Sequence, residues 1–313
     1  PDVGQAMAKG IASIAFAVAG FGVWSLVWGQ LIGALVCSVL AWTVIPWRPR
    51  FHLHRRLVGP LMRFGGPLLV TDIETAIWSN LDYVIVGRLL GDAALGVYTL
   101  AYRLPEMLVL SVWRVLGNAI FPFFSSIQQF PDLLRKGFLA TIRYSQIVVV
   151  PLCVGLFITA DPVVRVLFGE QWTGAIPVLR LLSVFALVGS VGVNIGDVYK
   201  AIGRPDILAK LALLELALLT PALIIGARHG LIGVGTAHAL VAAVDTTVRL
   251  TVARHFVNVT FRDIGRQLLP SFTAGTALGV VAAGVLWLTS GAGHGISLAA
   301  TVTIGAATYF AVL

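Results

Sequence analysis

The chain has 313 residues, 58% of them hydrophobic, a mean hydropathy of +0.92 and a formal net charge of +8 at neutral pH. This composition is too apolar for a soluble fold. The basic residues lie between apolar segments and form no aromatic-interleaved basic domain, so nucleic acid is not expected as a partner. The composition predicts an all-α, polytopic membrane protein.

About ten apolar segments follow one another, most of them near the length of about 20 residues that crosses a bilayer core as a helix. We expect them near residues 8–20, 23–45, 64–87, 94–124, 139–160, 175–198, 206–227, 230–253, 268–290 and from 296 onward. They lack the period-two alternation of membrane β-strands. Because the chain starts with Pro1 and stops inside an apolar segment, we expect it to be a fragment.

Basic residues gather in every second gap between these segments, as the positive-inside rule predicts for cytoplasmic loops. The clustered residues are Arg48, Arg50, Arg55, Arg56 and Arg63, then Arg135, Lys136 and Arg143, then Lys200, Arg204 and Lys210, and finally Arg249, Arg254, Arg262 and Arg266. The other gaps hold mostly one arginine each, such as Arg88. The segment 46–63 is therefore predicted to be cytoplasmic and to separate two helical bundles.

Two consecutive apolar segments concentrate polar and charged side chains. A charge at the bilayer centre costs at least about 2.5 kcal/mol, so each needs a reason. Arg103 and Glu106 are three residues apart and can pair on one helical face. We interpret the set as the lining of a hydrophilic cavity whose arginines face an anionic substrate, since guanidinium groups match phosphate oxygens. The candidate cavity residues are Arg103, Arg114, Glu106, Asn80, Asp82 and Arg88, and the candidates for ion coupling are Asp72 and Glu74.

The alternative interpretation of these charges is a set of interhelical ion pairs that fix the bundle. The acidic residues of later segments favour that alternative, and they are Asp197, Asp206, Glu215 and Asp245. The sequence contains no metal-ligand spacing, phosphate-binding loop or nucleophile motif. We therefore expect no metal, no cofactor and no catalytic residue, and the chain is not predicted to be an enzyme.

Several loose motifs occur in a specific order along nearly the whole chain. They are Phe64-Gly65-Gly66-Pro67, Asn80-Leu81-Asp82-Tyr83, Val86-Gly87-Arg88-Leu89-Leu90-Gly91, Ala101-Tyr102-Arg103, Val166-Leu167-Phe168-Gly169-Glu170-Gln171-Trp172 and Ala201-Ile202-Gly203-Arg204-Pro205. With these motifs the chain resembles the polysaccharide transporters, or lipid-linked oligosaccharide flippases, of the multidrug/oligosaccharidyl-lipid/polysaccharide exporter superfamily.

The resemblance implies two six-helix lobes around a central cavity. Residues 1–45 would be the last two helices of the N-terminal lobe, 46–63 a cytoplasmic basic linker, 64–254 the C-terminal lobe and 255–313 two additional helices. It also implies alternating access in the bacterial cytoplasmic membrane, with an undecaprenyl-linked sugar as substrate and polysaccharide polymerase or export components as partners. Arg103, on the Ala-Tyr-Arg motif, would engage the pyrophosphate, whereas Arg114 is inferred from spacing alone.

Three alternatives remain open at the level of the sequence. A multidrug or metabolite exporter of the same superfamily would favour a cavity dominated by carboxylates, and here the arginines at least equal them. A membrane-embedded glycosyltransferase would need an acidic site on a sizeable outward loop, and the outward gaps are short. The third alternative is a non-transporting scaffold of a polysaccharide export complex.

Overall fold

A computed structural model describes residues 2–44, 55–110, 120–192, 195–289, 291 and 293–313. The described part of the chain is helical and contains no strand. It divides into two compact units, Pro1–Arg56 and Leu57–Leu313. Residues 45–54, which include most of the predicted basic linker before α3, lie outside the described residues.

The first unit is a helical hairpin. Helix α1 (Asp2–Val18) packs against α2 (Trp24–Val44). The turn between them needs positive φ angles, which Gly20 (86°) and Gly22 (53°) adopt without strain.

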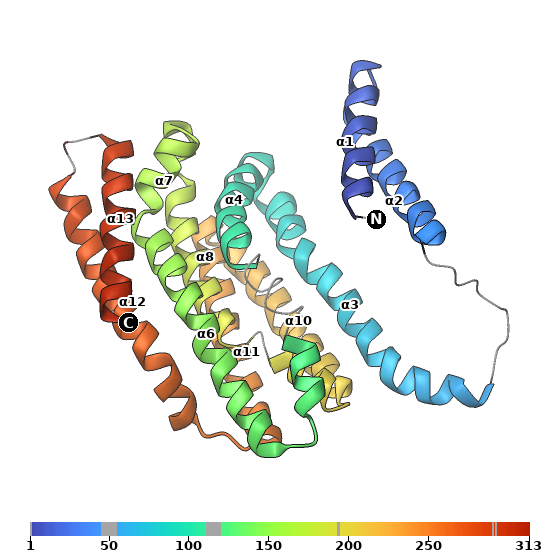
Figure 1. Ribbon diagram of the computed structural model, residues 1–313. Helices are drawn as coiled ribbons and strands as arrows, with labels where there is room; N and C mark the ends of the chain where they lie inside the picture. The colour runs from blue at the N-terminus through green and yellow to red at the C-terminus, as the bar shows by residue number, and fades with distance from the viewer. Residues whose placement is uncertain (1, 45–54, 111–119, 193–194, 290, 292) are drawn as a thin grey trace. The chain divides into compact units, whose positions relative to one another are not determined.

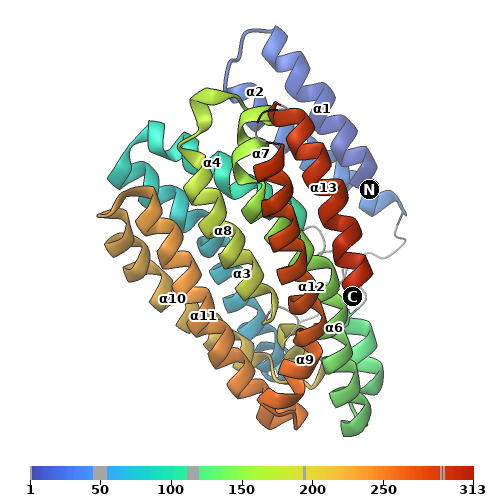
Figure 2. The same ribbon diagram turned by 90° about the vertical axis from the view of Figure 1, so that its left-hand side faces the viewer.

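The elements of the second unit begin with a long helix and end with a pair of helices at the C-terminus (Figures 1 and 2). They are α3 (Arg55–Leu90), α4 (Asp92–Pro105), the π-helix η1 (Glu106–Leu110), a helical stretch over 120–127, α6 (Pro131–Ile158), α7 (Ala160–Leu167), the 3-10 turn η2 (Glu170–Trp172), α8 (Ala175–Ser190), α9 (Ile195–Ala201), α10 (Pro205–Ala227), α11 (Gly230–Val257), α12 (Phe261–Leu288) and α13 (His294–Val312).

Seven helices of the described chain are long and apolar enough to cross a membrane. They are Trp24–Thr43, Pro131–Ile158, Ala175–Ala201, Pro205–Ala227, Gly230–Val257, Phe261–Leu288 and His294–Val312. The chain is thus a multi-pass helical membrane protein, whereas the count of about ten spans stays a prediction. Helix α1 has only 17 residues, and α3, with 36 residues, carries several charges.

Two of the differences between predicted segments and observed helices concern the charged segment 94–124 and the predicted linker. The segment expected over 94–124 is interrupted, because α4 ends at Pro105 and a π-helix follows. Proline lacks the N–H group that an α-helix needs, and the wider i→i+5 turn accommodates the change. The first segment of the second unit begins at Arg55 instead of near Phe64, since helix α3 includes Arg55, Arg56 and Arg63, which are assigned to the linker.

The core of the second unit is built where α4, α8, α10 and α11 meet. Large side chains that are fully buried there include Tyr98, Leu179 and Leu223. Helices α12 and α13 pack on α6, where Val150 and Tyr309 are fully buried; α6, α12 and α13 also lie together in Figure 2. The two additional C-terminal helices therefore form a layer on one side of this unit.

Helices α10 and α11 approach each other closely after a short turn. A Cβ atom at Gly226 would overlap the carbonyl group of Gly233, and a Cβ atom at Gly233 would overlap that of Gly226. Since the obstructing atoms belong to the backbone, a side chain at either position must push the helices apart. The two glycines therefore set the separation of α10 and α11.

We predict that Gly233→Ala lowers stability by about 1–3 kcal/mol, the usual penalty of overpacking. The matched control is Gly284→Ala on α12, where a Cβ atom meets nothing within 4 Å. This control should be neutral or slightly stabilising, because alanine is the better helix former. Thermal unfolding of the purified protein in detergent measures both changes, and equal midpoints for the two variants would contradict the close approach.

Candidate functional site

The second unit contains a cavity of about 920 Å³ between α3, α9, α10 and α11. Phe121 and Pro122, from the helical stretch before α6, complete its wall. The charged residues that line it are Asp72, Glu74, Asp197, Lys200, Glu215 and Arg249. A cavity of this size with charged walls, inside a bundle of membrane-spanning helices, is suited to a polar solute.

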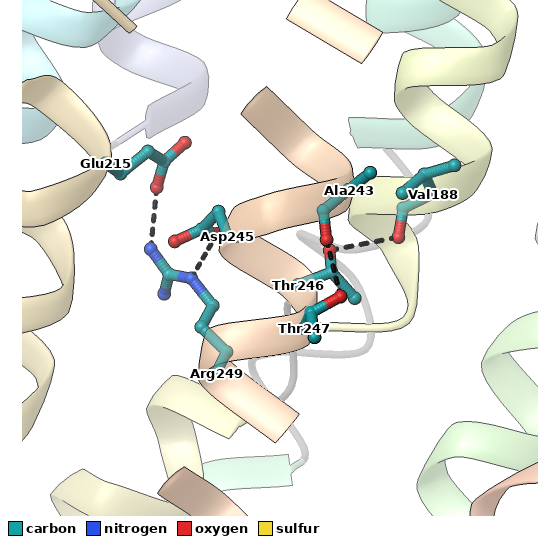
Figure 3. A network of polar contacts seen from close by, with 7 residues as sticks. All are labelled: Val188, Glu215, Ala243, Asp245, Thr246, Thr247 and Arg249. Atoms are coloured by element: carbon teal, nitrogen blue, oxygen red, sulfur yellow. Dashed lines mark hydrogen bonds and ion pairs between the residues drawn. The ribbon is translucent and has the colours of Figure 1, made fainter. Parts of the chain in front are cut away.

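Arg249 on α11 is the central cation of this wall (Figure 3). Its Nη2 donates to Glu215 Oε2 of α10 at 2.6 Å, and its Nε donates to Asp245 Oδ2, one turn earlier on α11, at 2.5 Å. Only 13% of the Arg249 side chain is exposed, with 20% for Glu215 and 11% for Asp245. Because buried charges are tolerated when paired and hydrogen-bonded, the three side chains depend on one another.

Next to the Arg249 pairs, α11 also contacts the end of α8, where the chain turns before α9. Helix α8 ends at Ser190 and α9 begins at Ile195. Near the end of α8, Thr246 of α11 donates from its Oγ1 to the carbonyl oxygen of Val188 at 3.2 Å (Figure 3). A smaller cavity of about 210 Å³, lined by Gly189, Gly192 and the three charged residues, adjoins the break. A discontinuous helix beside a charged cavity is a common feature of binding sites in transporters.

The two candidates for ion coupling both line the large cavity. Glu74 is buried, with 7% of its surface exposed, whereas Asp72 is exposed. Their wall faces Glu215 and Arg249 across the same cavity. The structure therefore brings together the acidic residues of α3 and the charged residues of α10 and α11.

Lys200 supplies the second cation of the cavity. Its Nζ lies 3.4 Å from Asp197 Oδ1, one turn earlier on the short helix α9. The lysine side chain is 38% exposed, so it remains accessible from the cavity.

The predicted cavity residues are dispersed in the structure. Asp82 is buried in a separate hydrogen-bonded cluster and does not line the large cavity. Asn80 is exposed and donates to the carbonyl oxygen of Ala76, one turn before it, at 2.9 Å. Arg88 is exposed in the last turn of α3.

The pairing predicted within the segment 94–124 is not observed either. Arg103 is exposed and forms no ion pair with Glu106 in the described structure. Glu106 lines a different, small cavity of about 30 Å³ together with Tyr102 and Phe185. Arg114 lies outside the described residues.

Arg249 is counted among the basic residues of a cytoplasmic gap, although the segment expected over 230–253 already includes it. In the structure it belongs to α11, which continues to Val257, and it pairs with Glu215 and Asp245. The i,i+4 spacing of Asp245 and Arg249 is a usable signal for their pairing. No local signal indicates Glu215, because it comes from another helix.

We predict that Arg249→Met lowers stability by up to about 3–5 kcal/mol, because it leaves two buried carboxylates without their cation. Adding Glu215→Gln and Asp245→Asn to that variant should recover most of the loss. The control, Arg204→Gln, breaks a pair whose side chains are 49% and 39% exposed, and should cost at most about 1 kcal/mol. Thermal unfolding measures the series. A triple variant no more stable than Arg249→Met would exclude charge burial as the cause.

Comparison with known proteins gives a consistent family relationship. Residues 2–177 match the family described as "Polysaccharide biosynthesis protein". The chain is 30% identical over 278 residues to the lipopolysaccharide biosynthesis protein WzxC of Escherichia coli. This match covers 84% of this chain and 56% of the relative. It is 29% identical over 223 residues to the succinoglycan biosynthesis transport protein ExoT of Rhizobium meliloti, covering 70% of this chain and 44% of the relative. The chain thus spans about half the length of these relatives.

Among solved structures, the fold is similar to that of the lipid II flippase MurJ in an inward closed conformation. The TM-score is 0.70 at 17% sequence identity, and the match covers 98% of this chain and 65% of the MurJ chain. At this identity the likeness concerns the fold.

Proposed function

Because this chain belongs to the polysaccharide biosynthesis protein family, we propose that it is part of a flippase. The flippase moves a polyprenyl-pyrophosphate-linked oligosaccharide across the cytoplasmic membrane of a bacterium by alternating access. The observation that carries the proposal is the cavity of about 920 Å³ with charged walls inside a membrane-spanning bundle. A cavity of this kind can shield sugar hydroxyls and phosphates from hydrocarbon while the polyprenyl tail stays in lipid.

Within this proposal, Lys200 and Arg249 are the cations that meet the pyrophosphate. Lys200 is accessible from the cavity, and among the described residues its ion-pair partner is Asp197 on its own helix. Arg249 is shared between Glu215 and Asp245, so an incoming phosphate competes with these carboxylates for its donors. Arg103, Arg114 and the other residues predicted from the sequence stay proposals for further contacts.

Glu74 is the carboxylate we propose for ion coupling, with Asp72 beside it on α3. It is nearly buried, it faces the cavity, and the guanidinium of Arg249 is already held by two other carboxylates. A cation that neutralises Glu74 changes the net charge of the wall that the substrate contacts.

We further propose that the protein works without a catalytic residue and that polysaccharide polymerase or export components act beside it.

We predict that Lys200→Gln reduces surface polysaccharide when the full-length gene is expressed in a strain that lacks its own flippase. A charge-assisted hydrogen bond contributes about 1.5–3 kcal/mol, so binding of the pyrophosphate should weaken roughly ten-fold or more. Lys200→Arg should retain activity. Surface polymer is measured at equal protein levels in the membrane.

Two further variants complete this experiment. Arg103→Ala tests the arginine of the Ala-Tyr-Arg motif, which is exposed and outside the described cavities. Lys136→Gln changes a basic residue near the start of α6, away from the cavity, and should behave as wild type. The flippase proposal fails if loss of the gene leaves surface polymer unchanged. The assignment of Lys200 fails if Lys200→Gln and Lys136→Gln are equally active.

An exporter of organic cations is the second candidate. It is favoured by the acidic character of the cavity, whose described charged lining consists of four carboxylates against two cations. Glu215, however, is paired with Arg249, and Asp197 is paired with Lys200. Efflux of a cationic dye from cells that express the gene, abolished by Glu74→Gln, would favour this candidate over the flippase.

A further inference from the structure

A second buried polar cluster lies outside the large cavity, where α3, α4 and α11 meet. Tyr98 of α4 bridges Asp82 of α3 and His238 of α11. Its Oη lies 2.7 Å from Asp82 Oδ2 and 3.0 Å from His238 Nε2, while the carboxylate and imidazole atoms are 3.7 Å apart. Asp82 and His238 are each 2% exposed, and Tyr98 is fully buried.

The surroundings of this cluster offer little compensation for charge. The Tyr83 backbone N–H donates to Asp82 Oδ1 at 2.8 Å. Aromatic rings of Tyr83, Tyr102 and Phe185 enclose Tyr98 and His238 from α3, α4 and α8. Beyond these tyrosines, the charged groups that act here are Glu106, which adds negative potential at Asp82, Arg103, which acts on Tyr83, and Glu215, which acts on Tyr102.

The ion pairs of the described chain include no lysine or arginine bound to Asp82. With Asp82 ionised and His238 neutral, the cluster would carry a buried negative charge without a cation, which is strongly unfavourable. One bound proton removes this net charge, whether it resides on the carboxyl group or on the imidazole. The geometry therefore favours a cluster that holds one proton.

We propose that Asp82, Tyr98 and His238 form a proton-binding site in which Tyr98 relays one proton between the carboxyl group and the imidazole. In the neutral form, Asp82 Oδ2–H donates to Tyr98 Oη, and the Tyr98 hydroxyl donates to His238 Nε2. When the carboxyl proton passes to Tyr98 Oη, the original hydroxyl proton passes to His238 Nε2. The products are a carboxylate, a neutral tyrosine and an imidazolium, so the net charge is unchanged and no other reactant is needed.

The helices that hold this site also form walls of the large cavity. Asp82 follows Glu74 and Trp78 on α3, and His238 precedes Asp245 and Arg249 on α11. A movement that separates α3 from α11 therefore breaks the bridge through Tyr98 and exposes its proton. The inference rests on the geometry of the cluster and does not depend on which solute the cavity carries.

Infrared spectroscopy of the full-length protein in lipid at neutral pH, combined with nitrogen NMR of its histidines, tests whether the proton is present. We expect the C=O stretching band of a protonated carboxyl group, an imidazolium signal from His238, or both in exchange. Asp82→Asn should remove the carboxyl band. The control Asp161→Asn should leave it, because Asp161 is a carboxylate paired with Arg165 on α7. Isotopic labelling of the aspartate carboxyl carbons separates an aspartate band from those of glutamates such as Glu74. Where Asp82→Asn does not fold, a shift of the labelled band in His238→Gln assigns it to this cluster.

A double-mutant cycle tests the relay itself. His238→Gln keeps an amide near the position of Nε2 but cannot bind a proton, so the proton stays on Asp82 and the carboxyl signal should shift or gain intensity. In a Tyr98→Phe background, the same substitution should leave that signal unchanged, because the bridge is gone. The absence of both a protonated Asp82 and a protonated His238 would overturn the proton site. An equal effect of His238→Gln in both backgrounds would overturn the relay through Tyr98.

Discussion

The guanidinium group of Arg249 is shared by two carboxylates, Glu215 from α10 and Asp245 from its own helix. None of the three can remain charged inside the bundle without the others, because the desolvation of an isolated ion outweighs what nearby dipoles return. This mutual dependence joins α10 to α11, and the close approach at Gly226 and Gly233 supports the same pairing. It also places Glu215 and Arg249 on the wall of the cavity, so that this wall is charged instead of apolar.

The cost of burying an unpaired charge is also compensated on α3, but in two different ways. Near Glu74 the charges face a large cavity, where a solute or an ion can compensate them. Near Asp82 the bundle is closed, because the side chain is buried and its partners Tyr98 and His238 lie among aromatic rings. Compensation there has to come from a proton. Two polar sites on one helix therefore differ in what they can bind, and a displacement of α3 would affect both.

Much of the fold could be predicted from the sequence. Apolar segments of spanning length predict the helices from α6 onward, because a bilayer leaves the backbone few alternatives to a continuous helix. The ordered motifs predict the family, which the match over residues 2–177 confirms. The helix boundaries were less accurate: Pro105 ends α4 within a predicted segment, and α3 begins at Arg55. Local hydropathy does not indicate at which residue the backbone hydrogen bonds of a helix begin, end or change from the α to the π pattern.

The sequence by itself determined that the chain is a multi-pass helical protein of this family, and that the segment of α3 concentrates charged side chains. Only the tertiary structure decided which charges meet. Asp72 and Glu74 line the cavity as the sequence suggests, but the cations opposite them are Lys200 and Arg249 instead of Arg103. Asp82 meets His238, far away in the sequence. The reason is physical, because hydropathy fixes how deep a residue lies, whereas the rotation and packing of helices fix which neighbour it faces.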